Sequence, residues 1–269
     1  MNRRLHRAAA PSLLLTFAAL ALAGCSANSA TSPLNAVSNA QSNEAAVEVG
    51  MMVYAGTTPD VVPNSVVSGG TGSSGTIHGR GASPAAAETT VTNGNVTWNL
   101  SVRWFDASSN EQANYDPATT VRMQANSRGN GAVTGVNGSG TLHSAGTIDM
   151  MGVDQAATQV STNATRNDTL SWTATGPSGS ATGLTHSTGT LANVVEAKPV
   201  DQNYPSSGTG TWDLDVNRQL QGDAGSISEH FVAHVVVTFN GTHLVPLVVN
   251  GTHHFLLDLD TGAVTLVNA

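Results

Sequence analysis

Alternation of apolar and polar residues marks the clearest element of this chain, at residues 96–104. Every second side chain there is large and apolar, as in a strand that packs one face against a core; these residues are Val96, Trp98, Leu100, Val102 and Trp104. Shorter runs between turn residues predict further strands around residues 120–125, 141–150, 158–165, 169–175, 190–196 and 209–216. Their polar positions are mostly Ser, Thr and Asn, as on the solvated face of an antiparallel sheet.

The last forty or so residues contain the strongest turn signals. Asn240-Gly241 and Asn250-Gly251 each lie between alternating runs, and Asn-Gly favours a two-residue hairpin turn. A third turn at Thr261-Gly262 completes a meander of four strands. The resulting register pairs Phe239 with Thr242, Thr238 with His243, Val249 with Thr252, Leu247 with His254 and His243 with Asp258.

This register divides the C-terminal hairpins into two faces. The face expected to pack in the core carries Phe231, Val235, Val237, Phe239, Leu244, Val248, Phe255, Leu257 and Leu259. The opposite face is rich in histidine and carries His230, His234, Thr238, His243, Leu247, His254, Leu256, Asp258 and Asp260.

The whole pattern predicts an all-β body, an antiparallel meander that forms a sandwich or a curved, partly closed barrel. Residues 45–54 fit a short helix and a first strand about equally well. Residues 56–87 are rich in Gly, Ser, Pro and Ala and predict loops. We expect a single β-rich domain over residues 45–269, preceded by a disordered N-terminal tether.

The first 24 residues have the composition of a signal peptide. Arg3, Arg4 and Arg7 form a positive head, followed by a short apolar segment at residues 13–22. That segment has about half of the ~20 apolar residues that a membrane-spanning helix needs. Residues 26–43 are small and polar, which predicts a flexible tether.

The tetrapeptide Leu22-Ala23-Gly24-Cys25 resembles the lipobox of bacterial lipoproteins. The resemblance covers residues 1 to about 26 and implies cleavage before Cys25 and attachment of diacylglycerol and palmitate-type acyl chains to its thiol. Residues 25–44 would then be a lipidated tether to the membrane. Ser26, in place of the Asp that retains such proteins in an inner membrane, implies the outer membrane of a two-membrane cell envelope, facing the periplasm or the outside.

Charge argues against nucleic acid as a partner. Without the signal peptide the chain has seven basic and eighteen acidic residues, a net charge of −11. Nucleic-acid binding relies on a basic face, which such a chain lacks. Cys25 is the only cysteine, so the sequence also predicts no disulfide.

The histidine-rich face suggests a metal site, but the distances between its candidate ligands argue against one. The candidate ligands are His230, His234, His243, His254 and Asp258. In the predicted register a whole strand separates His234 from His254, ~9 to 10 Å, which is too far for one ion. We therefore expect no metal cofactor and interpret the face as a half-exposed sheet surface that gains positive charge in acid.

Two acidic motifs suggest hydrolase chemistry. Residues 260–263, Asp-Thr-Gly-Ala, resemble the signature of aspartic proteases, in which Asp260 would activate water. No second Asp-Thr-Gly precedes it and few residues follow, so a tight hairpin turn accounts for the motif. The pairs Asp213/Asp215 and Asp258/Asp260 each place two carboxylates on one strand face, as a calcium site or an acid pair would need.

Three functions are compatible with these features. The first is a non-enzymatic envelope lipoprotein with a structural role or a glycan, peptide or protein partner. The second is a carrier of lipid or another apolar ligand in a half-open barrel. The third is a metal-dependent or acid/base hydrolase that uses the His/Asp face. Because no catalytic constellation can be assembled from the sequence, we favour the first and expect no enzymatic activity.

Overall fold

The computed structural model describes residues 38–57, 87–93, 95–135, 138–176, 179–198, 204–222 and 225–267. The predicted signal peptide, Cys25 and the first part of the predicted tether lie outside these residues, as do most of the loops predicted over 56–87. The described elements are α2 (Asn39–Thr57), β1 (Ala87–Asn93), β2 (Val96–Phe105), β3 (Glu111–Gln112), β4 (Arg122–Gly135), β5 (Gly138–Met151), β6 (Gln159–Gly176), β7 (Gly179–Ala197), β8 (Ser207–Gly222), β9 (Gly225–Thr238), β10 (Leu244–Val249), β11 (His253–Asp258) and β12 (Val264–Leu266).

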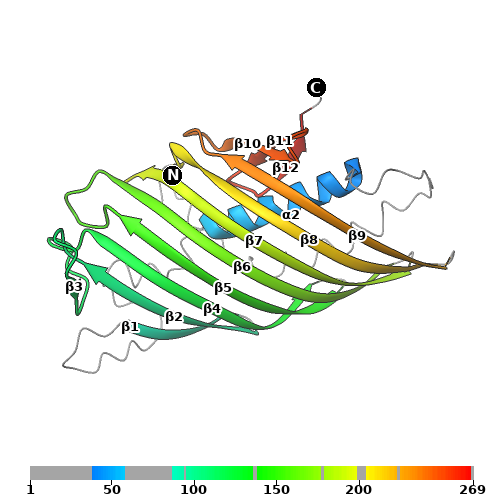
Figure 1. The fold of residues 1–269 in the computed structure, drawn as a ribbon, viewed down its shortest axis with the longest axis horizontal. Helices are drawn as coiled ribbons and strands as arrows, with labels where there is room; N and C mark the ends of the chain where they lie inside the picture. The colour runs from blue at the N-terminus through cyan, green and yellow to red at the C-terminus, as the bar shows by residue number, and fades with distance from the viewer. Residues whose placement is uncertain are drawn as a thin grey trace.

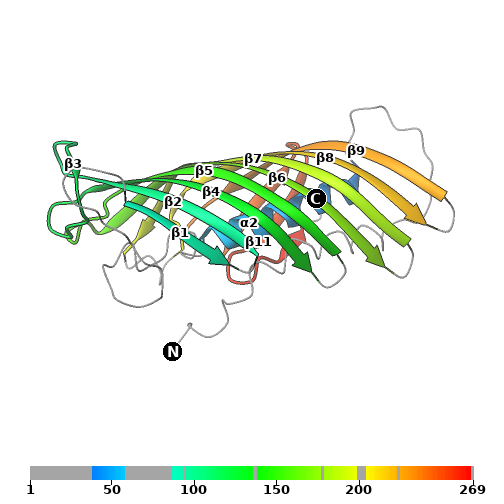
Figure 2. The same cartoon turned by 90° about the horizontal axis from the view of Figure 1, so that it is seen from below.

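All strands belong to one antiparallel sheet (Figure 1). Its order follows the chain from β1 to β12, except that the short β3 pairs with β2 beside this path. The prediction of an all-β antiparallel meander is therefore confirmed. The meander is open rather than closed, and it arches over α2, so the sheet has a concave face that bears the helix and a convex outer face (Figure 2).

Residues 45–54, which fit a helix and a strand about equally well by sequence, are helical. α2 begins with a capping box, in which Gln41 N donates to Ser38 Oγ and Ser38 N donates to Gln41 Oε1. Its buried residues, Ala45, Ala46, Val49 and Val53, recur at helical spacing. Residues 39–44, which we assigned to the tether, form the first turns of this helix, because the cap starts it six residues before the apolar stripe.

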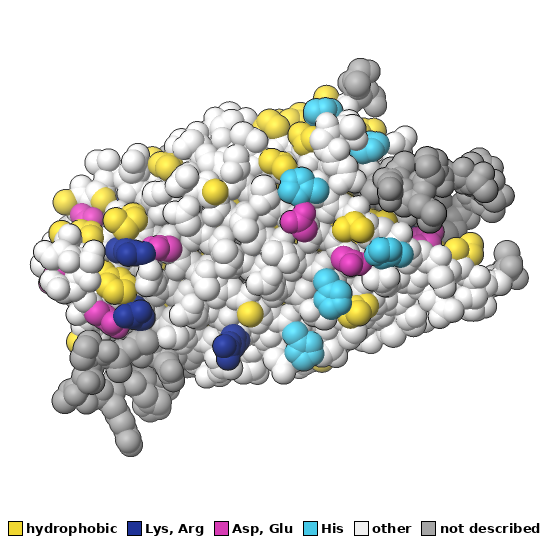
Figure 3. All heavy atoms as spheres, viewed as in Figure 1, with side chains coloured by type: hydrophobic (Ala, Val, Ile, Leu, Met, Phe, Trp, Pro, Cys, Tyr) yellow, Lys and Arg dark blue, Asp and Glu magenta, His cyan; other side chains and the backbone are white. Residues whose placement is uncertain are grey.

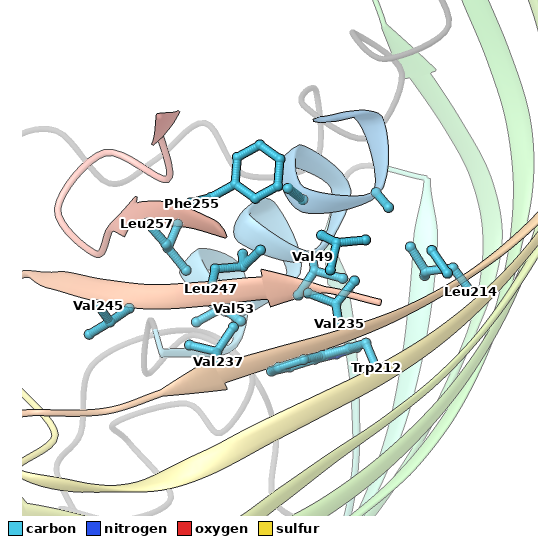
Figure 4. Close-up of a cluster of buried hydrophobic side chains, with 14 of the residues drawn as sticks. Val49, Val53, Trp212, Leu214, Val235, Val237, Val245, Leu247, Phe255 and Leu257 are labelled. Atoms are coloured by element: carbon cyan, nitrogen blue, oxygen red, sulfur yellow. The ribbon is translucent and has the colours of Figure 1, made fainter. Parts of the chain in front are cut away.

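The main core lies between α2 and the C-terminal half of the sheet (Figure 4). It combines helix residues such as Val49 and Val53 with Leu214 of β8 and Val235 of β9. α2 packs mainly against β9, β10, β11 and β12. An N-terminal helix therefore covers the last strands of the meander.

The predicted register of β10 is wrong. Leu247 pairs with Val237 on one side and with Phe255, not His254, on the other. Residues 239–243 and 250–252 form longer loops than two-residue turns. Asn250 and Gly251 nevertheless have the positive φ expected of Asn-Gly, and Thr252 N donates to Val249 O. The shift turns β10 over, so its core residues are Val245, Leu247 and Val249 rather than Leu244 and Val248.

Several predicted strands are too short. The segments 158–165 and 169–175 are parts of the single strand β6, and β4, β5 and β7 extend through glycines that we interpreted as turns. Tryptophans of adjacent strands occupy the space beside such glycines. A Cβ on Gly183 would lie 2.4 Å from Trp172, and one on Gly129 would lie 2.6 Å from Trp98. Because these glycines have no side chain, the tryptophan rings pack directly against the backbone of the adjacent strand on the concave face.

Candidate functional site

The predicted histidine ligands on β9 are paired with aspartates on the outer face. His230 Nε2 lies 3.0 Å from Asp215 Oδ1, and His234 Nδ1 lies 2.7 Å from Asp213 Oδ1. All four side chains are about half exposed or more. Two separate histidine–aspartate pairs therefore replace the single cluster that a metal ion would need.

The remaining predicted ligands do not join these pairs. Asp258 pairs with Leu244 instead of His243, whose ring lies 6.0 Å from that of Tyr204. His254 pairs with Val248 and is exposed. Within the described part of the chain, no three His, Cys, Asp or Glu residues come together as a metal site.

Sequence reasoning missed two outer-face histidines. His143 and His186 lie on either side of Thr169, and Thr169 Oγ1 is 3.0 Å from His186 Nδ1. Histidine side chains gather on one half of this face (Figure 3). A shallow, open hollow of about 490 Å³ lies beside them, with His230 in its lining.

The Asp-Thr-Gly motif forms a turn. Asp258 Oδ1 accepts from Asp260 N, and Gly262 has a φ of 73°. Both carboxylate oxygens of Asp260 accept from Tyr204 Oη at 2.8 Å. The two Asp-Leu-Asp motifs also have separate partners, since Asp213 and Asp215 are held by the histidines of β9.

The concave face has a polar centre that the sequence did not reveal. Ser144 of β5 lies directly opposite Asp168 of β6, which lies opposite Ser187 of β7. Ser144 is only 7% exposed, and its hydroxyl has no hydrogen-bond partner. An unpaired buried hydroxyl is unfavourable unless a ligand or water satisfies it.

Asp168 itself is bound by its neighbour on β6. Arg166 Nε lies 2.7 Å from Asp168 Oδ2, and the Asp168 side chain is 9% exposed. The guanidinium of Arg166 lies 5.7 Å from the centroid of the Trp98 ring. A charged pair and an aromatic ring therefore adjoin the unpaired serine.

Glu48 of α2 completes this group, which we call the concave polar centre: Glu48, Ser144, Arg166 and Asp168. Burial raises the pKa of Glu48 to about 8, with added repulsion from Glu44 and Asp168. Among the described residues Glu48 has no hydrogen bond or ion pair. It is therefore neutral at pH 7 and lies close enough to Asp168 to feel its charge.

A second charged cluster fixes α2 to the sheet. Arg218 of β8 lies 2.6 Å from Glu44 of α2 and 2.7 Å from Glu229 of β9, and its side chain is 7% exposed. Burial raises the pKa of Glu44, and the charge of Arg218 partly opposes that rise. Because Arg218 is shared by two carboxylates, it does not neutralise Glu48.

Apolar residues flank the polar centre in two clusters that are separate from the core packed against α2. One cluster consists of Val96, Val133, Leu142, Leu170, Trp172, Ala174, Ala181 and Leu220, with Trp98 packed against it. A second consists of Val102, Trp104, Met123, Ala125 and Val153. The described elements are one helix and one sheet, so no further described helix or sheet packs on this part of the concave face.

Comparison with protein-family models, curated proteins and solved structures finds no match to this chain. The described helix lacks the combination of length and apolar character needed to cross a membrane.

Proposed function

We propose that this protein is a membrane-anchored lipoprotein of the cell envelope that binds an apolar or amphiphilic ligand on the concave face of its sheet. One observation carries this proposal: the apolar residues of the concave face continue across β2–β7, whereas α2 packs mainly against β9–β12. A buried apolar lining on a curved sheet suits a ligand that also avoids water.

The anchor in this proposal is Cys25, which rests on the lipobox-like tetrapeptide. A cysteine with several acyl chains holds a protein to a membrane without a spanning helix. The body would then act beside the bilayer, where single-chain amphiphiles and lipids are available.

The outer face supports a ligand site less well. Its histidines and aspartates are exposed and satisfy one another in pairs, and its hollow is shallow and open. The concave face instead combines buried apolar side chains with an unpaired buried hydroxyl.

A fluorescent apolar probe tests the proposal. Titration of the full-length Cys25→Ser variant with N-phenyl-1-naphthylamine should give saturable binding. Trp98→Ala, on the concave face, should weaken it about tenfold, in proportion to the aromatic surface removed. Leu184→Ala is the matched control, because Leu184 is an exposed apolar residue of β7 outside all three core clusters. No saturable binding, or equal losses in both variants, would contradict the proposal.

A further inference from the structure

The concave polar centre contains more acceptors than the protein satisfies. Ser144, Asp168 and Glu48 come from β5, β6 and α2, and the register places Ser144 directly beside Asp168. Ser144 Oγ is buried without a partner. This buried hydroxyl is an observation independent of the acidic groups, and a ligand atom that bonds to it would satisfy it.

The charges around the centre are also unbalanced. Carboxyl groups of α2 and β6 lie near one another there, since Glu44 and Asp168 both raise the pKa of Glu48. The arginines there are Arg166, which binds Asp168, and Arg218, which binds both Glu44 and Glu229. Glu48 is left without a cation among the described residues, so a positive group would be stabilised beside it.

We propose that the ligand carries a primary ammonium headgroup that binds Glu48, Asp168 and Ser144, with its alkyl chain along the apolar residues of the concave face. This inference rests on the ligand-binding function proposed above. An ammonium group offers three donors, which match two carboxyl groups and one hydroxyl. A carboxylate headgroup would meet repulsion at the same place.

Binding of the ammonium group has a defined proton balance. Glu48 carries a proton at pH 7, since burial and its acidic neighbours raise its pKa to about 8. The bound cation favours the ionised carboxylate, so the Glu48 carboxylic acid loses its proton to solvent as the ammonium–carboxylate pair forms. The headgroup nitrogen keeps all three of its protons.

Isothermal titration calorimetry of the lipidated protein in zwitterionic nanodiscs tests the headgroup. The probes are octylammonium, octanol and octanoate, with empty nanodiscs subtracted. Octylammonium should bind about tenfold more tightly than octanol, in the range of a charge-assisted hydrogen bond. Its affinity should rise from pH 6 to pH 8, and its binding enthalpy should vary with the ionisation enthalpy of the buffer.

Three variants separate the residues. Glu48→Gln should bind octylammonium and octanol equally and release no proton. Glu111→Gln, which removes a carboxylate outside the centre, should behave as the unchanged protein. Ser144→Ala should weaken octylammonium several-fold.

Equal binding of octylammonium and octanol, or a preference for octanoate, would overturn the ammonium headgroup and leave the apolar-ligand function intact. Absence of binding by all three probes would overturn that function as well.

Discussion

Replacement of Glu48 with Gln should stabilise the protein, by an amount that depends on pH. Below pH 4.5 the carboxyl group is protonated in both the folded and the unfolded chain. Between pH 4.5 and about 8, the unfolded chain loses this proton while the folded chain retains it. The free energy of unfolding therefore falls as pH rises through this range, by about 1.4 kcal/mol for each unit.

The magnitude follows from the same values. At pH 7, about 2.5 units above the pKa of the unfolded chain, this loss amounts to about 3 kcal/mol. Residual contact of the half-buried side chain with solvent reduces this figure, so we expect Glu48→Gln to gain roughly 1 to 3 kcal/mol at pH 7. At pH 4 the gain should be close to zero, because a protonated carboxyl and an amide are similar in size and polarity.

Urea unfolding followed by tryptophan fluorescence at several values between pH 4 and pH 8 measures this difference. Glu111→Gln provides the contrast, because the hydrogen bond from Arg103 lowers the pKa of Glu111. Neutralising Glu111 should give no stabilisation that grows with pH. A Glu48→Gln gain that stays constant across this range, or a loss of stability at pH 7, would refute the burial of a protonated Glu48.

Further predictions concern the Arg218 ion cluster, the glycine–tryptophan contacts of the concave face, the outer face and the predicted lipid anchor. Arg218→Met should destabilise the fold by about 3 to 5 kcal/mol, because it leaves two partly buried carboxylates unpaired; a loss below about 1 kcal/mol in urea unfolding would count against the cluster. Gly183→Ala should lose about 1 to 3 kcal/mol, since its methyl group would overlap the indole of Trp172. Asp213→Asn should change stability by less than about 0.5 kcal/mol in thermal or urea unfolding, because its histidine pair is exposed. In a lipoprotein-processing host, the intact mass should show acyl chains on the wild type and none on Cys25→Ser; an unlipidated wild type would remove the anchor.

Alternation predicted the strands best where apolar side chains face a core. Residues 96–104 form most of β2, and their alternating apolar side chains are buried or, at Trp98, partly buried. Prediction failed where glycine replaces an apolar residue on the inner face, because the missing side chain is supplied by a tryptophan of the adjacent strand. A single strand read alone does not contain that information.

The concave polar centre could not be derived from the sequence, because its residues come from three distant segments without a motif. One signal was available: Glu48 lies between Ala45, Ala46, Val49 and Val53, which form the apolar stripe of α2. An acid on the buried side of a helix indicates either an ion pair or a raised pKa. The outer-face histidines had a weak signal, since His143 and His186 end the Gly-Thr-Leu-His and Gly-Leu-Thr-His segments, which share the same composition.

The order of strands in the sheet also bears on how the chain folds. Because nearly every strand pairs with the one before it, most contacts join residues that are close in sequence, which favours rapid folding by successive addition of hairpins. The packing of α2 against β9–β12 is the exception, since it joins the beginning of the described chain to its end. Docking of α2 must therefore wait until the last hairpins have emerged, and until then Glu48 remains ionised in water at neutral pH.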